Sequence, residues 1–200
     1  MPVLRRRRHS LVLKSFLSVF LGTGLTILEP MPSMARAEMQ AAAAQANSGA
    51  MLPQPEGQVI LRISGDLERG NIVDDTQTIA EFDLEMLRHF EAKTISTSTI
   101  WSSGRSDFLG VPLAVVLKAV GAEGRTLRLT ALNDYTIDMP VEMIEAEVPI
   151  LAYEMNGALL SSRDKGPLWV IYPFDNGPQY QNEESYSRAV WQLVRIEALP

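Results

Sequence analysis

From Gln58 onward, short runs of β-branched and aliphatic residues alternate with short helical patterns, and neither a linker nor an internal repeat interrupts them. Residues 94–100 and 168–172 have the composition of strands. Pro112 suits the first turn of a helix, and Gly121 suits the end of one. Because strands outnumber helices, the sequence predicts a single α/β domain of the α+β kind, with a mixed sheet and short helices.

The same patterns predict further elements around this framework. Residues 59–63 are expected to form the first strand, and Asp83 is expected to cap a short helix. Asn133-Asp134 lies between two strand-like segments, which predicts a hairpin, and Asn156-Gly157 predicts a second tight turn. Pro140 is expected to open another short helix.

The first 37 residues have the features of an export signal. Four arginines, Arg5 to Arg8, precede an apolar stretch at 11–28, and Ala35-Arg36-Ala37 provides a small-x-small cleavage site. We therefore expect a signal peptide over residues 1–37, cleaved near Ala37, and a periplasmic mature protein. The alternative is an uncleaved membrane anchor. An Ala-, Gln- and Pro-rich segment at 38–57 is expected to be flexible, and residues 58–200 form the predicted domain.

Charge and composition exclude several functions. Loss of residues 1–37 changes the formal net charge from −6 to about −11, which argues against nucleic-acid binding and against adhesion to anionic lipid, so no membrane insertion is expected after cleavage. The chain has no cysteine, and its two histidines are His9 and His89. Thiolate chemistry is thereby excluded, and a histidine metal site is not expected.

Three segments carry a resemblance to a known family. They are Ile-Leu-Ala-Tyr-Glu-Met-Asn-Gly at 150–157, Arg-Asp-Lys-Gly-Pro-Leu at 163–168, and Phe-Leu-Gly-Val-Pro-Leu at 108–113, with Trp191 following in the expected order. Over residues 58–199 the chain resembles the sulfite oxidase family, whose domain binds molybdopterin. The resemblance implies the sulfite oxidase fold in a single domain.

The chain departs from the family at cofactor positions. The family's molybdenum-ligating cysteine follows the strand matched by residues 94–100, and about Trp101 holds that place here. A histidine of the family's loop is Lys165, and a cofactor-binding arginine is about Trp169. Because an indole offers no lone pair to a metal, no molybdenum is expected.

A cysteine-free version of this domain resembles small bacterial proteins that bind reduced, tetrahydropterin-type pterins in the periplasm. In them the pterin acts as a signal, and the partner is the periplasmic domain of a membrane-bound signalling protein that controls cyclic di-GMP turnover. The resemblance therefore implies a non-catalytic pterin-binding regulator. Two alternatives remain open, which are a molybdopterin-dependent periplasmic oxidoreductase and a ligand-free accessory domain.

A pterin site should offer an aromatic face and a hydrogen-bond acceptor for the ring's donor edge. Trp101 is the candidate for stacking, against simple core packing, and Asp134 is the candidate carboxylate, against a purely turn-forming role. Tyr135 and Trp169 are weighed against core packing, and Arg105 and Lys165 against solvated surface charge. The predicted ligand-binding residues are Thr99, Trp101, Arg105, Asp134, Tyr135, Lys165 and Trp169.

Overall fold

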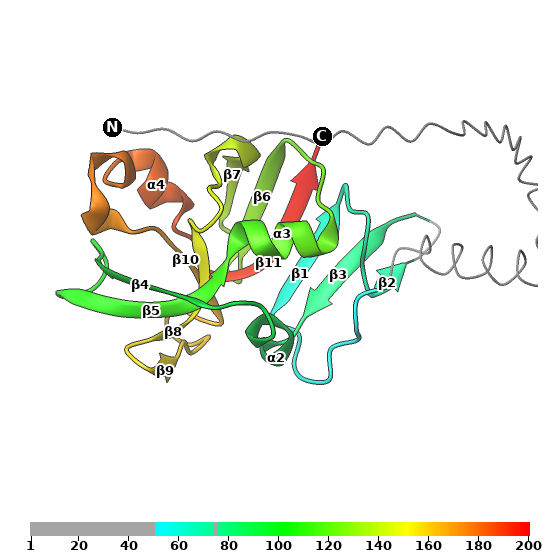
Figure 1. The fold of residues 1–200 in the computed structure, drawn as a ribbon, viewed down its shortest axis with the longest axis horizontal. Coiled ribbons are helices and arrows are strands. Elements are labelled where there is room, and N and C mark those ends of the chain that lie inside the picture. Colours follow the sequence, from blue (N-terminus) through cyan, green and yellow to red (C-terminus); the bar gives the residue numbers. More distant parts are fainter. Residues whose placement is uncertain (1–50, 74–75) are drawn as a thin grey trace, which may run out of the picture. The chain divides into compact units, whose positions relative to one another are not determined.

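One mixed sheet organises residues 51–73 and 76–200, the part of the chain that the computed structural model describes (Figure 1). The expected signal peptide and residues 38–50 lie outside these described residues. The strands of the sheet are β1 (Leu61–Gly65), β2 (Ile72–Val73), β3 (Thr78–Phe82), β4 (Lys93–Ser98), β5 (Arg105–Pro112), β6 (Thr126–Ala131), β7 (Thr136–Pro140), β8 (Ile150–Met155), β9 (Ala158–Leu159), β10 (Leu168–Ile171) and β11 (Trp191–Leu199).

The main path of the sheet runs β2-β3-β1-β11-β10-β8-β5-β4. The β1–β11 pair is parallel, and the other pairs are antiparallel, so the sheet is mixed as the sequence predicts. The start of β11 pairs with β10, and its later residues lie between β1 and β6. β6 and β7 form the hairpin expected around Asn133-Asp134, and β9 pairs with β8 through the expected Asn156-Gly157 turn.

Within the described residues, three short α-helices and three 3₁₀ turns accompany the sheet. The helices are α2 (Leu84–Arg88), α3 (Leu113–Val120) and α4 (Glu183–Arg188), and the turns are η1 (Val141–Met143), η2 (Phe174–Asn176) and η3 (Pro178–Tyr180). The Asp83 carboxylate caps α2 by accepting the Met86 N–H at 2.8 Å, as expected. α3 ends at Gly121, whose φ of 61° is left-handed, also as expected. Pro112, expected in the first turn, is instead the residue before the helix, with an extended ψ of 131°.

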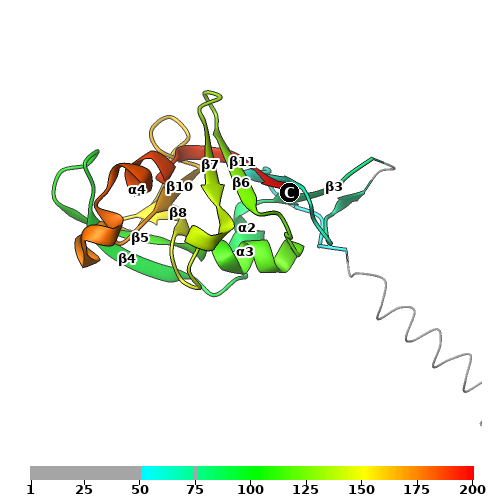
Figure 2. The same cartoon turned by 90° about the horizontal axis from the view of Figure 1, so that it is seen from above.

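Two apolar cores lie on opposite faces of the sheet. The larger includes β1, β6 and β11 residues packed against the buried face of α3 (Figures 1 and 2). The smaller consists of Ile95, Phe108, Ile150, Ala152, Trp169 and Ile171. Along β10, Trp169 and Ile171 face the smaller core while Val170 faces the larger one, in agreement with the alternation of strand side chains.

The structure also differs from the sequence-based expectations. Strand β5 is not predicted by the sequence analysis, which expects Pro112 to open a helix. Gly110 lies within β5, and a Cβ on it would meet the Leu151 carbonyl oxygen at 2.2 Å. A side chain there would clash with β8, so the glycine permits close strand pairing. Helix α4 and strand β3 were also not expected. The helix after Pro140 is a single 3₁₀ turn, and the strand expected at 94–100 ends at Ser98.

The described residues contain no helix of the length and apolar character that a membrane crossing requires.

Candidate functional site

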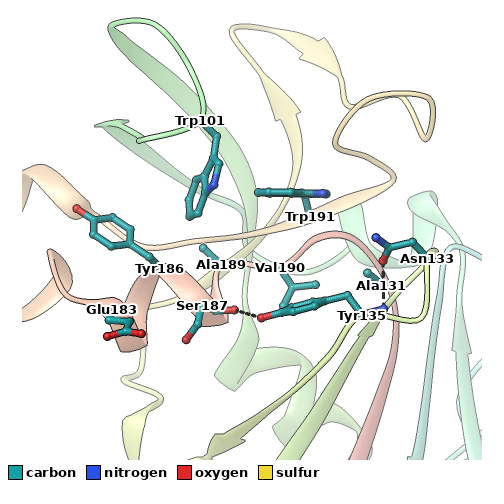
Figure 3. A pocket seen from close by; sticks show the side chains of 10 residues that line it. All are labelled: Trp101, Ala131, Asn133, Tyr135, Glu183, Tyr186, Ser187, Ala189, Val190 and Trp191. Atoms are coloured by element: carbon teal, nitrogen blue, oxygen red, sulfur yellow. Dashed lines mark hydrogen bonds between the residues drawn. The ribbon is translucent and has the colours of Figure 1, made fainter.

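A cavity of about 390 Å³ opens where the loop after β4, the β6–β7 turn and the α4 segment meet (Figure 3). Its volume lies in the range of small-ligand sites, and most of its wall is apolar. The lining residues are Trp101, Ala131, Asn133, Tyr135, Glu183, Tyr186, Ser187, Ala189, Val190 and Trp191.

Trp101 is at the centre of the aromatic wall. Its ring lies edge-to-face against Trp191 at 5.4 Å and Tyr186 at 5.9 Å between centroids. On its inner side it contacts Trp169 at 6.1 Å and Phe174 at 6.3 Å. Aromatic pairs prefer this tilted geometry, which holds Trp101 in place and leaves ring surface at the cavity. Trp101 is thus both a packed residue and a lining residue.

Thr99 shapes the loop that carries Trp101. Its Oγ1 accepts the Trp101 backbone N–H at 3.2 Å and lies 2.7 Å from the Ser102 Oγ. Thr99 does not line the cavity, so it acts on the site by fixing the backbone beside Trp101.

The β6–β7 turn supplies a second wall. Asn133 Oδ1 accepts the Tyr135 N–H at 3.1 Å, and Asp134 between them has a left-handed φ of 61°. The Tyr135 hydroxyl donates to the Ser187 carbonyl at 3.2 Å and so joins this turn to α4 (Figure 3). Tyr135 is 45% exposed and lines the cavity, rather than packing beneath the sheet.

Helix α4 contributes the charged part of the lining. Asn182 caps it by accepting the Ser185 N–H at 2.8 Å, which fixes Glu183 in the first turn. Glu184 forms an ion pair with Arg188 at 3.7 Å. Among the described residues, Glu183 is the charged member of the lining, and it has no ion-pair partner there.

The remaining sequence-predicted residues lie outside the lining. Asp134 is 84% exposed at its side chain and pairs with Arg195 at 3.0 Å. Arg105 donates to the Ser96 carbonyl at 2.8 Å and lies 3.7 Å from Asp175.

Two further predicted residues, Lys165 and Trp169, lie beside the cavity without lining it. The Lys165 Nζ lies 5.6 Å from the centroid of the Trp169 ring. Trp169 is fully buried, and its indole N–H donates to the Ala189 carbonyl at 3.1 Å, which fixes the backbone of a lining residue. Trp169 thus supports the cavity floor without lining it.

Sequence reasoning missed most of the wall formed by the α4 segment. Glu183 is not among the predicted ligand-binding residues, and the sequence analysis gives Trp191 only as part of the family resemblance. Tyr186, Ser187 and Asn133 were not singled out. The signal that could have found α4 is Asn182 followed by Glu183 and Glu184, with Arg188 in the last turn.

The residues present fit a flat organic ring better than a thiolate-ligated metal. The chain has no cysteine, and the described part of it contains no group of three or more His, Asp or Glu side chains arranged to hold a metal ion. The family resemblance places the metal ligand at about Trp101, and an indole supplies no lone pair. Aromatic faces and a carboxylate, in contrast, suit a heterocycle with hydrogen-bond donors.

Comparison with known families gives one match. The model of the family described as "Oxidoreductase molybdopterin binding domain" matches residues 74–178, just over half of the chain. No curated protein matches the chain.

Proposed function

We propose that this chain, which belongs to the oxidoreductase molybdopterin binding domain family, binds a reduced pterin without a metal and acts as a non-catalytic regulator. In this proposal it works in the periplasm and relays pterin occupancy to the periplasmic domain of a membrane-bound signalling protein that controls cyclic di-GMP turnover. The family's domains bind a cofactor whose organic part is itself a pterin, so the proposal keeps the ring and omits the metal.

The observation that carries the proposal is an aromatic cavity with one unpaired carboxylate in a chain without cysteine. Trp101, Trp191 and Tyr186 provide ring surfaces around the cavity. A pterin is flat, and one edge carries neighbouring N–H donors. Stacking on an indole and a bidentate contact to a carboxylate are the interactions that such a ring favours.

Glu183 is the best candidate to accept hydrogen bonds from that donor edge. It lines the cavity and has no ion-pair partner among the described residues, whereas Asp134 is paired with Arg195 and points away from the lining. Glu183 is itself exposed to solvent, and a ligand edge that donates to its carboxylate forms charge-assisted hydrogen bonds, each stronger than a neutral one.

The relay role rests on the family resemblance and on the site's position. The cavity lies between a turn, a loop and a short helix, so a bound ligand contributes to the outer surface beside Tyr135 and α4. A partner that contacts this region meets a different surface when the cavity is filled. Export rests on the N-terminal sequence, in which a basic segment and an apolar segment precede Ala37.

A second candidate function is a molybdopterin-dependent oxidoreductase, the activity after which the matched family is described. It would require a metal held without a thiolate, for which the described residues offer no cluster of ligands. Stoichiometric molybdenum in the purified protein would favour this alternative. A ligand-free accessory domain is the third reading, and it predicts that the cavity binds no pterin at all.

The test is an anaerobic titration of the protein with tetrahydrobiopterin, followed by the quenching of tryptophan fluorescence. We expect saturable binding. Glu183→Gln should weaken it by roughly ten- to a hundredfold, because a charged hydrogen bond contributes about 1.5–3 kcal/mol.

Glu184→Gln is the matched control. It removes the neighbouring carboxylate, which is paired with Arg188 and does not line the cavity, so affinity should stay close to that of wild type. Absence of saturable binding would overturn the proposal. Equal losses in the two variants would remove Glu183 from its assigned role.

A further inference from the structure

The register between β10 and β11 changes beside the cavity. Leu168 pairs with Leu193, and the next residue, Trp169, pairs with Trp191. One step along β10 therefore corresponds to two steps along β11, so Gln192 is the extra residue of a β-bulge. The register of β11 with β6 also shifts just beyond this point, between Leu193 and Arg195.

This bulge determines which face of the sheet receives Trp191. Residues two apart in a regular strand point to the same face. Here Leu193 is buried in the larger core together with Leu168, whereas Trp191 packs against the smaller core that contains Trp169. With Gln192 in a regular strand, Trp191 would face the larger core. The extra residue turns Trp191 toward Trp101 and the cavity.

Gln192 has an unusual backbone that three hydrogen bonds hold in place. Its φ is 52°, in the left-handed region that non-glycine residues adopt at a cost. Its N–H donates to the Lys165 carbonyl at 3.0 Å, and its carbonyl accepts the Leu132 N–H at 2.9 Å. Its side-chain Nε2 donates to the Ser162 carbonyl at 2.8 Å.

These bonds connect two segments that flank the site. Leu132 belongs to the β6–β7 turn and lies between the lining residues Ala131 and Asn133. Ser162 and Lys165 belong to the loop between β9 and β10. Gln192 itself does not line the cavity. Its influence on a ligand therefore passes through Trp191 and through the turn.

We propose that Gln192 is a positioning residue whose bulge aims Trp191 into the cavity and holds the β6–β7 turn against it. The inference rests on the proposed pterin-binding function, because it assigns the geometry of that same site. Strain at the bulge is retained because the neighbouring loops hold it, a pattern typical of binding sites.

The test compares three variants in the ligand-free and ligand-bound protein. Gln192→Val disfavours a left-handed φ and also loses the side-chain bond, while Gln192→Gly loses the bond but keeps the backbone conformation. Asn156→Val is the matched control, since Asn156 has a φ of 53° in a turn that does not line the cavity. Near-ultraviolet circular dichroism reports the packing of the Trp101–Trp191 pair, whose centroids are 5.4 Å apart.

We expect Gln192→Val to change the near-ultraviolet spectrum and to weaken tetrahydrobiopterin binding by roughly tenfold or more, because the stacked indole is displaced. Gln192→Gly should restore most of the spectrum and of the affinity. Asn156→Val should lose stability but keep the wild-type spectrum and affinity.

Wild-type spectrum and affinity in Gln192→Val, or a loss of affinity in Asn156→Val as large as in Gln192→Val, would overturn the inference. If wild type binds no pterin, the proposed function fails. The ligand-free spectra would still decide whether Gln192 positions Trp191. If Gln192→Val does not fold, Gln192→Gly is compared instead with a variant that lacks Gln192. We expect the deletion to abolish the wild-type near-ultraviolet spectrum and Gln192→Gly to retain most of it.

Discussion

Replacement of Trp101 by alanine should affect both the fold and the binding of a ligand. Trp101 contacts four aromatic rings at centroid distances between 5.4 and 6.3 Å. Each such pair contributes about 0.5–1.5 kcal/mol beyond buried area, and truncation of a buried Trp costs about 3–5 kcal/mol. Because Trp101 is only partly buried, we expect a loss of about 3 kcal/mol, which lowers Tm by about 6–12 °C in a domain of this size.

The effect on affinity is separate and equally large. Loss of the stacking face removes about 0.5–1.5 kcal/mol, and loss of contact area removes about 1–2 kcal/mol more, so tetrahydrobiopterin affinity should fall ten- to several-hundred-fold. The assay is an anaerobic titration of each variant below its unfolding transition, with calorimetric unfolding of the ligand-free protein. Trp101→Phe, which keeps an aromatic face, is the control and should lose less in both measurements. Unchanged affinity in folded Trp101→Ala would refute the assignment of the ligand to this cavity.

Three further predictions concern the Asp83 cap of α2, the close approach of β5 to β8, and the expected signal peptide. Hydrogen bonds from the N–H groups of Met86 and Gly57 lower the pKa of Asp83, so the stabilisation that the ionised carboxylate provides is present above about pH 4 and is lost as pH falls through the folded-state pKa. In urea unfolding, the stability advantage of wild type over Asp83→Asn should therefore shrink from about pH 7 towards about pH 2, and a constant difference would exclude an ionic contribution. Gly110→Ala should lower the free energy of unfolding by about 3 kcal/mol or more, because the new Cβ would meet a β8 carbonyl oxygen at 2.2 Å. The control Gly157→Ala, at a φ of 78° with open space around it, should lower it by about 1 kcal/mol, so equal melting temperatures of the two variants would contradict the close β5–β8 approach. Sequencing of the periplasmic protein should find an N-terminus at or within a few residues of Glu38, and an intact Met1 would favour a membrane anchor.

Local signals in the sequence were sufficient for much of the fold. Pro112 and Gly121 fixed the ends of α3 because each residue acts on its own backbone. The turn pairs Asn133-Asp134 and Asn156-Gly157 placed two hairpins for the same reason. The α+β class with a mixed sheet, and the family with its sulfite-oxidase-type fold, are both confirmed.

The missed elements depend on long-range packing. Gly110 reads as a strand breaker, yet it is needed where β5 approaches β8 closely. Helix α4 has few apolar residues, so its periodicity is weak, and it is held by the Asn182 cap and by packing of Tyr186 on Phe174 at 5.1 Å. The Asn182 cap is a local signal, whereas the close β5–β8 approach and the packing of Tyr186 on Phe174 cannot be inferred from neighbouring residues in the sequence.

In the candidate site too, some residues follow from the sequence and others depend on long-range packing. Trp101 was expected to meet a ligand because the family resemblance puts the metal ligand at about this position, and the structure places Trp101 in the cavity wall. The carboxylate was expected at Asp134, but a left-handed φ turns that residue outward to Arg195, and the cavity receives Glu183 from a segment about fifty residues later in the chain. The bulge at Gln192 leaves no pattern in the sequence, because it results from the pairing of β11 with two different strands.

The most direct test of a metal-free pterin site is the ligand content of protein purified anaerobically from the periplasm. One portion is denatured and its released pterin is quantified by fluorescence after oxidation, and a second portion is analysed for molybdenum. We expect a pterin, either retained from the cell or bound stoichiometrically after incubation with tetrahydrobiopterin, and only trace molybdenum. Stoichiometric molybdenum, or protein that holds no pterin even after that incubation, would contradict this expectation.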